Sequence, residues 1–265
     1  MTPPPGPPLR WHERVDVPMV LSVLAIAAVV WAASGVALPE RPVDVSGSAR
    51  RMLERFLSPD FSDARLWPAL LETLRIAVIA TAVAGMAALP LGLLGSRQIA
   101  GAWIALPTRM LLAGLRTVPS LVWAILAVAF IGLGAPELCG VVALTAYSLG
   151  YLAKFYADSV DSVDVAAARA LRSAGASRMQ VVRHGYWPEI RPQVWSHALW
   201  MLEYNIRSGT IIGLVGAGGL GLLLQDYLQV GDWHRLSALL CVLIGVVVLL
   251  DLVGDRLRAA LLRQG

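Results

Sequence analysis

Long apolar runs separated by short polar segments dominate the pattern of this chain. The first run, residues 18–38, carries no charge and has about the 20 residues that a helix needs to cross a bilayer. Later apolar runs with few or no charges lie at 76–94, 117–136, 138–153, 194–215 and 236–250. The pattern therefore predicts an all-α, polytopic membrane protein with about six transmembrane helices.

The composition indicates that lipid must solvate much of this surface. Of the 265 residues, 57% are hydrophobic and 15% are charged, whereas soluble domains have roughly 25% charged residues. The two cysteines and four histidines are scattered along the chain, so they predict neither a disulfide framework nor a metal site. These observations exclude an ordinary water-soluble fold.

Polar segments set the expected domain boundaries. Residues 1–17 are rich in proline and are expected to be disordered and cytoplasmic. After the first span, residues 39–67 are expected to form an external loop, with a short amphipathic stretch at 48–57. Residues 68–257 are expected to form the membrane core, and residues 258–265 a cytoplasmic C-terminus.

The positions of the arginines predict the orientation in the membrane. An even number of spans puts both termini on one side, and cytoplasmic loops are enriched in Lys and Arg. The side that holds the termini also collects Arg97, Arg109, Arg116 and the segment from Lys154 to Arg191. We therefore expect a multi-pass protein of the inner membrane with both termini in the cytoplasm.

The segment 163–190 is basic and interrupts the apolar runs. Its pattern predicts two short helices joined by a glycine elbow. Asp161 or Asp164 can cap the first helix, and Gly175 is well placed to end it in a left-handed conformation.

A second helix is expected to begin after Ser177, which can act as its N-cap. Gly185 is expected to end this helix, and Pro188 to prevent it from resuming. The residues alone leave two roles open for this pair of helices, because a basic amphipathic surface can lie on anionic lipid headgroups or dock into a groove of another protein.

The same segment resembles the coupling loop of ABC importer permeases, whose pattern is E-A-A, three residues, Gly, nine residues and I-x-L-P. Ala170, Gly175 and Pro188 stand in register with that pattern, whereas Arg169 replaces the glutamate and Gly185 the isoleucine. The chain is most similar to phosphonate-type permeases, through "FLSPDF" (56–61), "LRTVPSLVWAI" (115–125) and "EYNIRSGTIIGLVGAGGLG" (203–221). The resemblance implies a type I ABC importer permease fold with cytoplasmic coupling helices.

By this resemblance, the coupling helices at 163–190 seat on a separate ATPase subunit and transmit its movement to the spans. The residues expected to take part are Ala170, Leu171, Arg172, Gly175, Ala176, Ser177, Arg178 and Pro188.

The sequence contains no phosphate-binding G-x-x-x-x-G-K-[ST] loop, so we expect a non-catalytic subunit without a cofactor, ATP and Mg being bound by the ATPase. The resemblance implies these partners: a second copy of the chain, two ATPase subunits, an extracellular solute-binding protein and membrane lipid, but no nucleic acid. It also implies that the cargo is a phosphorus oxyanion, namely phosphonate, phosphate or phosphite. The alternatives are another small solute such as an amino acid, or secondary transport without ATP.

Two charges lie inside the predicted span 194–215. Glu203 and Arg207 are one helical turn apart, with Asn205 between them, and Arg207 lies about 20 Å from the start of the span. Because an intramembrane charge is costly unless it is paired or faces water, two main interpretations arise. Either the pair neutralises itself and fastens neighbouring helices, or these three residues face the translocation path and Arg207 attracts an oxyanion. A latch between subunits is a third possibility.

The stretch "GAGGLG" matches the dinucleotide-binding pattern G-x-G-x-x-G. That pattern binds a nucleotide only between a strand and a helix, and here it follows a predicted membrane span. We instead expect the glycines to permit tight helix ends and close packing. By resemblance, Gly216, Gly218, Gly219 and Gly221 lie beside the external gate.

Overall fold

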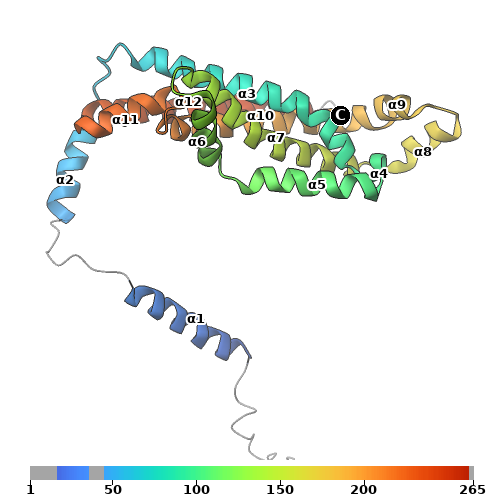
Figure 1. The fold of residues 1–265 in the computed structure, drawn as a ribbon, viewed down its shortest axis with the longest axis horizontal. Helices are drawn as coiled ribbons and strands as arrows, with labels where there is room; N and C mark the ends of the chain where they lie inside the picture. Colours follow the sequence, from blue (N-terminus) through green and yellow to red (C-terminus); the bar gives the residue numbers. More distant parts are fainter. Residues whose placement is uncertain (1–16, 36–44, 263–265) are drawn as a thin grey trace, which may run out of the picture. The chain divides into compact units, whose positions relative to one another are not determined.

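The structure is a computed structural model that describes residues 17–35 and 45–262, and these ranges hold helices but no strand. The expectations for residues 1–16 and 263–265 and for the end of the first span lie outside the described residues. The chain divides into two units, residues 1–50 and 51–265. The apolar helix α1 (Val17–Ser34) lies in the first unit, and α2 (Val45–Phe56) confirms the predicted amphipathic stretch (Figure 1).

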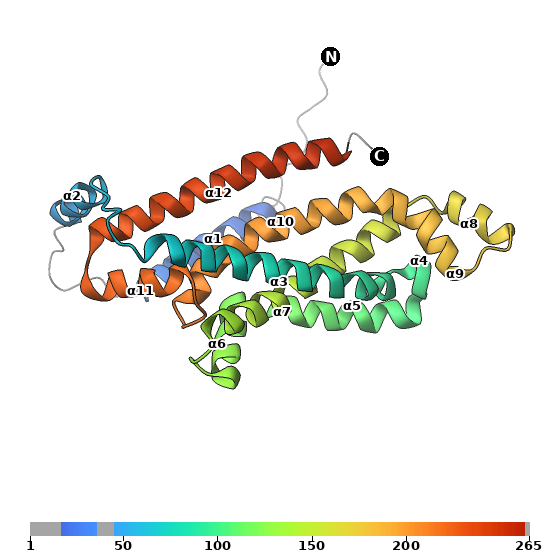
Figure 2. The ribbon, with the colours of Figure 1, turned by 90° about the horizontal axis from the view of Figure 1, so that it is seen from above.

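Four long helices run along the second unit: α3 (Leu66–Gly95), α7 (Pro136–Ser162), α10 (Trp187–Gly213) and α12 (Trp233–Leu262) (Figure 2). Within the described residues, α3, α7 and the first part of α12 are long and apolar enough to cross a membrane, and α10 is not among them. These helices confirm an all-α membrane protein. They extend past the predicted apolar runs because each helix continues through flanking segments that contain charged residues, such as Glu72 and Arg75 in α3.

Close packing between α3 and α7 forms the centre of this unit. Four alanines of α3 recur every three or four residues with no exposed surface, and they are Ala77, Ala80, Ala84 and Ala88. A Cβ added to Gly92 would lie 2.7 Å from Cβ of Tyr156 on α7. Small residues on one helix face let two backbones approach closely, which is how helices associate in lipid.

The predicted span 117–136 is wrong as a single helix. Its residues form only the 12-residue helix α6 (Ser120–Ile131), which is bent by 85° from the preceding helix α5 (Ala102–Thr117). The bend lies at Val118, which is extended because a proline follows it. Together α5 and α6 are apolar and long enough for one broken span.

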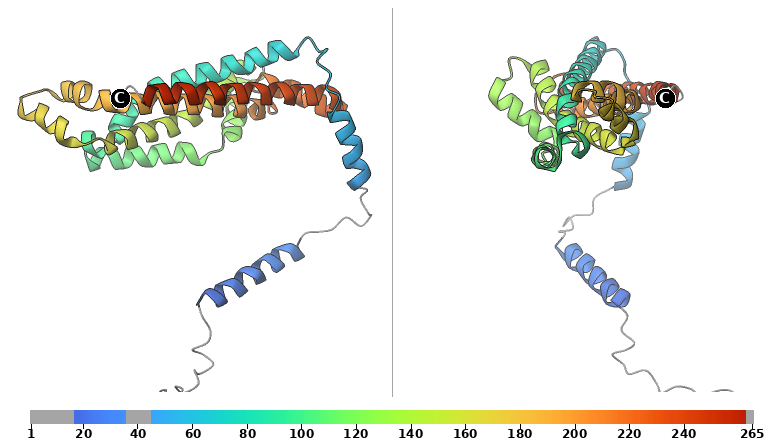
Figure 3. Two further views of the ribbon diagram at one scale, coloured as in Figure 1. Left: turned by 180° about the vertical axis from the view of Figure 1, so that it is seen from behind. Right: turned by 90° about the vertical axis from the view of Figure 1, so that its right-hand side faces the viewer.

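The two ends of the second unit carry different elements. The short helices α8 (Val165–Ser173) and α9 (Arg178–Val181) lie at one end, and α11 (Leu220–Val230) lies at the other (Figures 1 and 2). The helix α4 (Arg97–Ala100) and α5 lie near α8 (Figure 3). The basic segment and the glycine-rich segment are therefore at opposite ends of the long helices.

Candidate functional site

The first half of the basic segment folds as predicted. The side chain of Asp164 caps α8 by accepting a hydrogen bond from the backbone N–H of Ala166 at 3.0 Å. At the other end Gly175 has a φ of +84°, and the N–H of Ala176 donates to the carbonyl of Leu171. This is a Schellman motif, which satisfies the last carbonyls of a helix through a left-handed glycine. The glycine elbow is therefore confirmed.

Ser177 caps the next helix, as predicted. Its hydroxyl accepts from the N–H of Gln180, whose side chain accepts in turn from the N–H of Ser177. This reciprocal arrangement is a capping box. Two caps and one left-handed glycine thus define the shape of the elbow from Asp164 to Gln180.

The predicted end of the second helix is wrong. The chain passes from α9 through the π-helix η2 (Val182–Tyr186) directly into α10. Pro188 is the second residue of α10, directly after the π-helix, and the helical path continues through it. Gly185 instead permits close packing, because an added Cβ would lie 3.3 Å from Cδ1 of Leu171 and 3.4 Å from Cα of Ala168.

The predicted coupling residues present a basic and mostly exposed surface. Arg172 and Arg178 are exposed, as are Ala170, Ser177 and Pro188, whereas Leu171 and Ala176 are partly buried and contribute to the core. Beside them a groove of about 470 Å³ is lined in part by Arg97, Arg172 and Arg178. The segment therefore offers a shaped, positively charged surface that suits an acidic partner.

Asp161, the alternative cap, has a different role. Its carboxylate accepts hydrogen bonds from the Ser96 hydroxyl, from the backbone N–H groups of Arg97 and Gln98 at 3.2 Å, and from Arg109 Nη2 at 2.9 Å. Gln98 Nε2 donates back to the Asp161 carbonyl at 2.9 Å. The turn between α3 and α4 is thus fastened to the end of α7, directly before the coupling segment. The sequence reasoning missed this connection.

The three predicted translocation-path residues lie in different environments. Asn205 has no exposed surface, and its Nδ2 donates to Thr81 Oγ1 on α3 and to Ser148 Oγ on α7, both at 2.9 Å. Glu203 is 7% exposed, whereas Arg207 is exposed. Of the three, only Arg207 is therefore exposed, and Asn205 connects three helices through its hydrogen bonds.

A row of aromatic side chains beside Arg207 was also missed. Six rings follow one another along facing sides of α7 and α10: Tyr147, Tyr151, Phe155, His197, Trp200 and Tyr204. Their spacing of three or four residues within each helix was visible in the sequence. Their stacking across two helices was not, because it depends on how the helices pack.

The glycine-rich segment connects α10 to α11 as a tight turn. The backbone φ values of Gly216, Gly218 and Gly219 are +92°, +86° and +69°, and residues other than glycine rarely adopt such values. The N–H of Leu220 donates to Thr73 Oγ1 on α3 at 2.8 Å. Because the helix α10 precedes the turn, the G-x-G-x-x-G pattern lacks the strand that dinucleotide binding requires.

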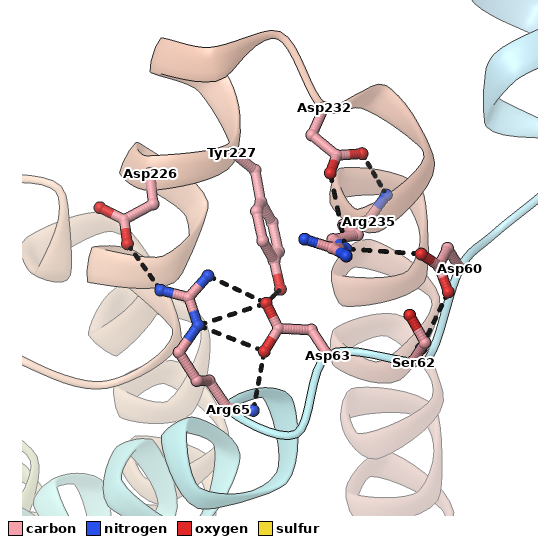
Figure 4. A network of polar contacts seen from close by, with 8 residues as sticks. All are labelled: Asp60, Ser62, Asp63, Arg65, Asp226, Tyr227, Asp232 and Arg235. Carbon is pink, nitrogen blue, oxygen red and sulfur yellow. Dashed lines mark hydrogen bonds and ion pairs between the residues drawn. The ribbon is translucent and has the colours of Figure 1, made fainter.

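An ionic network lies at the end of the unit that carries α11 (Figure 4). The Asp63 carboxylate accepts from Arg65 and from the Tyr227 hydroxyl at 3.0 Å, and Arg235 pairs with Asp60 and Asp232. Hydrogen bonds from the Arg65 side chain and backbone lower the pKa of Asp63 below 3.8, whereas burial raises the pKa of Tyr227 to about 12. Within the described ranges, no three His, Cys, Asp or Glu side chains form a group that could hold a metal ion.

Comparison with known proteins identifies the family. Residues 88–264 match the family described as "Binding-protein-dependent transport system inner membrane component". The chain is 34% identical over 252 residues to the phosphite transport system permease protein PtxC of Stutzerimonas stutzeri, covering 94% of this chain and 89% of that protein. It is 31% identical over 227 residues to the phosphate-import permease protein PhnE of Mycolicibacterium smegmatis, covering 85% of this chain and 42% of that protein.

A solved structure shows the same fold. The MetNI methionine ABC transporter in an inward-facing conformation aligns with a TM-score of 0.68 and 25% identity, covering 76% of this chain and 99% of the matched chain. The shared fold, the capped elbow in the basic segment and the family match over two thirds of the sequence agree with one another. The chain therefore belongs to the family of binding-protein-dependent transport system inner membrane components, and it is a multi-pass permease of the ABC importer type.

Proposed function

We propose that this permease imports a phosphorus oxyanion, namely phosphite, phosphate or phosphonate. The observation that carries the proposal is the exposed Arg207 on α10, within a chain otherwise similar to phosphite and phosphate permeases along most of its length. A guanidinium presents paired N–H donors that match two oxygens of a tetrahedral anion.

The longer helix changes the expected depth of Arg207. Because α10 begins at Trp187, Arg207 lies about 30 Å from its start and about 9 Å from its end at Gly213. This places the guanidinium in the half of α10 nearer the glycine-rich turn. A charge at this depth is unfavourable in hydrocarbon, so the side chain requires water or another protein surface around it.

The proposal includes the partners and the arrangement of the complex. Two copies of this chain would pair, each with its basic elbow seated on one of two ATPase subunits, and an extracellular binding protein would deliver the solute. ATP and Mg would be bound by the ATPase, so this chain would hold no cofactor and catalyse no reaction. Both termini would lie in the cytoplasm; the direction of α12, which runs from α11 toward the end that carries α8 and α9, supports this for the C-terminus.

The test is uptake by a reconstituted complex of this permease, its ATPase and its binding protein. With ATP inside the vesicles, we expect uptake of labelled phosphite, phosphate or methylphosphonate and no uptake of methionine. Arg207→Met should reduce uptake about tenfold, equivalent to about 1.4 kcal/mol, and leave assembly intact. The matched control Arg256→Met removes an exposed arginine near the end of α12 and should transport normally.

Three results would contradict the proposal. Uptake of methionine without any phosphorus oxyanion would identify a different cargo. Full uptake by this chain without the ATPase would identify a secondary transporter. Failure of Arg207→Met to assemble would assign Arg207 to structure and not to the path.

A further inference from the structure

The row of rings on α7 and α10, which we name the aromatic band, is continuous. Tyr147 stacks on Tyr204 with ring centroids 5.1 Å apart, and Phe155 stacks on His197 at 4.8 Å. Trp200 lies between these two pairs, 5.8 Å from Phe155 and 6.1 Å from Tyr204. All these rings are partly exposed, so the band forms a surface and not a core.

Three cations lie along this surface at different heights. The Arg116 guanidinium is 5.7 Å from the ring centroid of Tyr151, and Lys154 Nζ is 5.6 Å from that of Phe155. Arg207 lies one helical turn beyond Tyr204 on the same side of α10. Stacking on an aromatic face favours a cation while leaving its N–H donors free to bind an anion.

The spacing of the cations prevents one small anion from being held by all of them. Tyr204 stacks on Tyr147, so these two residues define a common level. Arg207 follows Tyr204 by three residues on α10 and therefore lies about 5 Å from that level, toward the glycine-rich turn. Arg116 lies over Tyr151, which is about 6 Å from that level toward the coupling segment. Lys154 lies about 11 Å from that level in the same direction. An anion would therefore meet them in succession.

This surface differs from those that suit lipid. Along the middle of α3 and α12, most exposed side chains are aliphatic, such as Ile79, Val83, Ile244 and Val248. By contrast, the band carries hydroxyl groups, an imidazole and three cations. Because cations within a span face water or protein and not hydrocarbon, the band belongs to the polar interior of the assembled transporter.

We propose that the aromatic band is the translocation surface, on which the anion passes from Arg207 to Arg116 and then to Lys154. This inference rests on the proposed function. Tyrosine hydroxyls can donate to the anion between the cations, and several weak sites allow the movement that one strong site would prevent. At the inner end Asp158 pairs with Lys154 at 2.9 Å, so its carboxylate competes for the ammonium and favours release of the anion.

The first test measures access without using transport. In a background with Cys139→Ala and Cys241→Ala, the variants Tyr151→Cys and Tyr204→Cys should react with an anionic methanethiosulfonate reagent in membranes. Val248→Cys, on the exposed side of α12, is the matched control and should react at least about tenfold more slowly, because hydrocarbon excludes the charged reagent.

Two outcomes of this test would overturn the proposal. Equal slow reaction of all three variants would show that the band faces lipid. Formation of disulfides between copies of Tyr204→Cys, without reaction with the reagent, would show that the band is a dry contact between subunits. Both conclusions hold whatever the transported solute is.

The second test uses the reconstituted importer and labelled phosphite. Arg116→Gln and Lys154→Gln should each reduce uptake about tenfold while stimulation of the ATPase by liganded binding protein persists. The conservative variant Lys154→Arg should retain most of the wild-type uptake, and the control Arg256→Gln should take up phosphite at the wild-type rate. Wild-type rates in Arg116→Gln and Lys154→Gln would overturn the band proposal alone, whereas the absence of phosphorus oxyanion uptake in wild type would overturn the proposed function.

Discussion

Asp161 at the end of α7 forms an ion pair with Arg109 of α5, with Oδ2 and Nη2 2.9 Å apart. The same carboxylate also binds the turn that begins α4, and the coupling helix α8 starts four residues after it. In the proposed function, a pull on the elbow would therefore reach α5 and the α3–α4 turn as well as α7. These contacts would let one short segment move several long helices together.

Asp161→Ala is expected to weaken this connection. Removal of the carboxylate leaves the Ser96 hydroxyl and the backbone N–H groups of Arg97 and Gln98 without this acceptor and removes one of the two carboxylates that pair with Arg109. This loss should lower the free energy of unfolding by about 2 kcal/mol. Thermal unfolding of the purified complex measures the effect. Asp158→Ala is the matched control, because Asp158 is more exposed and also pairs with Arg109; its cost should be about 0.5 kcal/mol. Equal losses in the two variants would argue against a special role for Asp161.

Asn205→Ala is expected to separate structural from transport effects in α10. The loss of buried hydrogen bonds to Thr81 and Ser148 should cost about 1–3 kcal/mol of unfolding free energy. Ser148→Ala should cost less, because Asn205 still binds Thr81. If Asn205→Ala instead kept full stability and lost only solute uptake, Asn205 would belong to the path.

Two glycines provide a matched test of close packing. A Cβ at Gly213 would collide with the Gly218 carbonyl and with Gly221, whereas a Cβ at Gly245 on α12 meets no atom within 4 Å. Gly213→Ala should therefore lower the thermal midpoint of the complex by several degrees, through overpacking of about 1–3 kcal/mol. Gly245→Ala should be neutral or slightly stabilising, since alanine favours helix. Similar midpoints for both variants would contradict the tight turn.

The network around Asp63 is expected to depend on pH. Because the folded-state pKa of Asp63 is lowered from 3.8, the stability that its carboxylate contributes is fully present above about pH 4 and is lost as the pH falls toward the lowered value. Asp63→Asn should reduce the thermal midpoint at pH 7 and lose that difference below pH 4. A constant difference between wild type and Asp63→Asn across this range would contradict the assignment.

Local signals in the sequence predicted the elbow well. Gly175, Asp164 and Ser177 act through hydrogen bonds to residues within five positions of themselves, so their roles are visible without the fold. The prediction for Pro188, in contrast, was wrong. A proline is compatible with the first turn of a helix and with its end, and the local sequence did not distinguish these positions.

Features that depend on packing between helices could not be predicted from the sequence. The span predicted at 117–136 includes only α6 of the bent pair α5 and α6. The apolar runs did not include α5, because this helix contains Arg109 and Arg116. The burial of Asn205 and the stacking of Tyr147 on Tyr204 follow from the contact of α10 with α3 and α7. Periodicity places such residues on a helix face but does not say which helix they meet.

The most direct test of the whole account replaces residues 165–181 with a flexible glycine–serine linker of equal length. This change removes the capped elbow and keeps the connection between α7 and α10. The measurement is ATP-driven uptake of phosphite by the reconstituted importer, together with the rate of ATP hydrolysis. We expect uptake to fall to the level seen without ATP, whereas import at the wild-type ATP-dependent rate would contradict the role of the elbow.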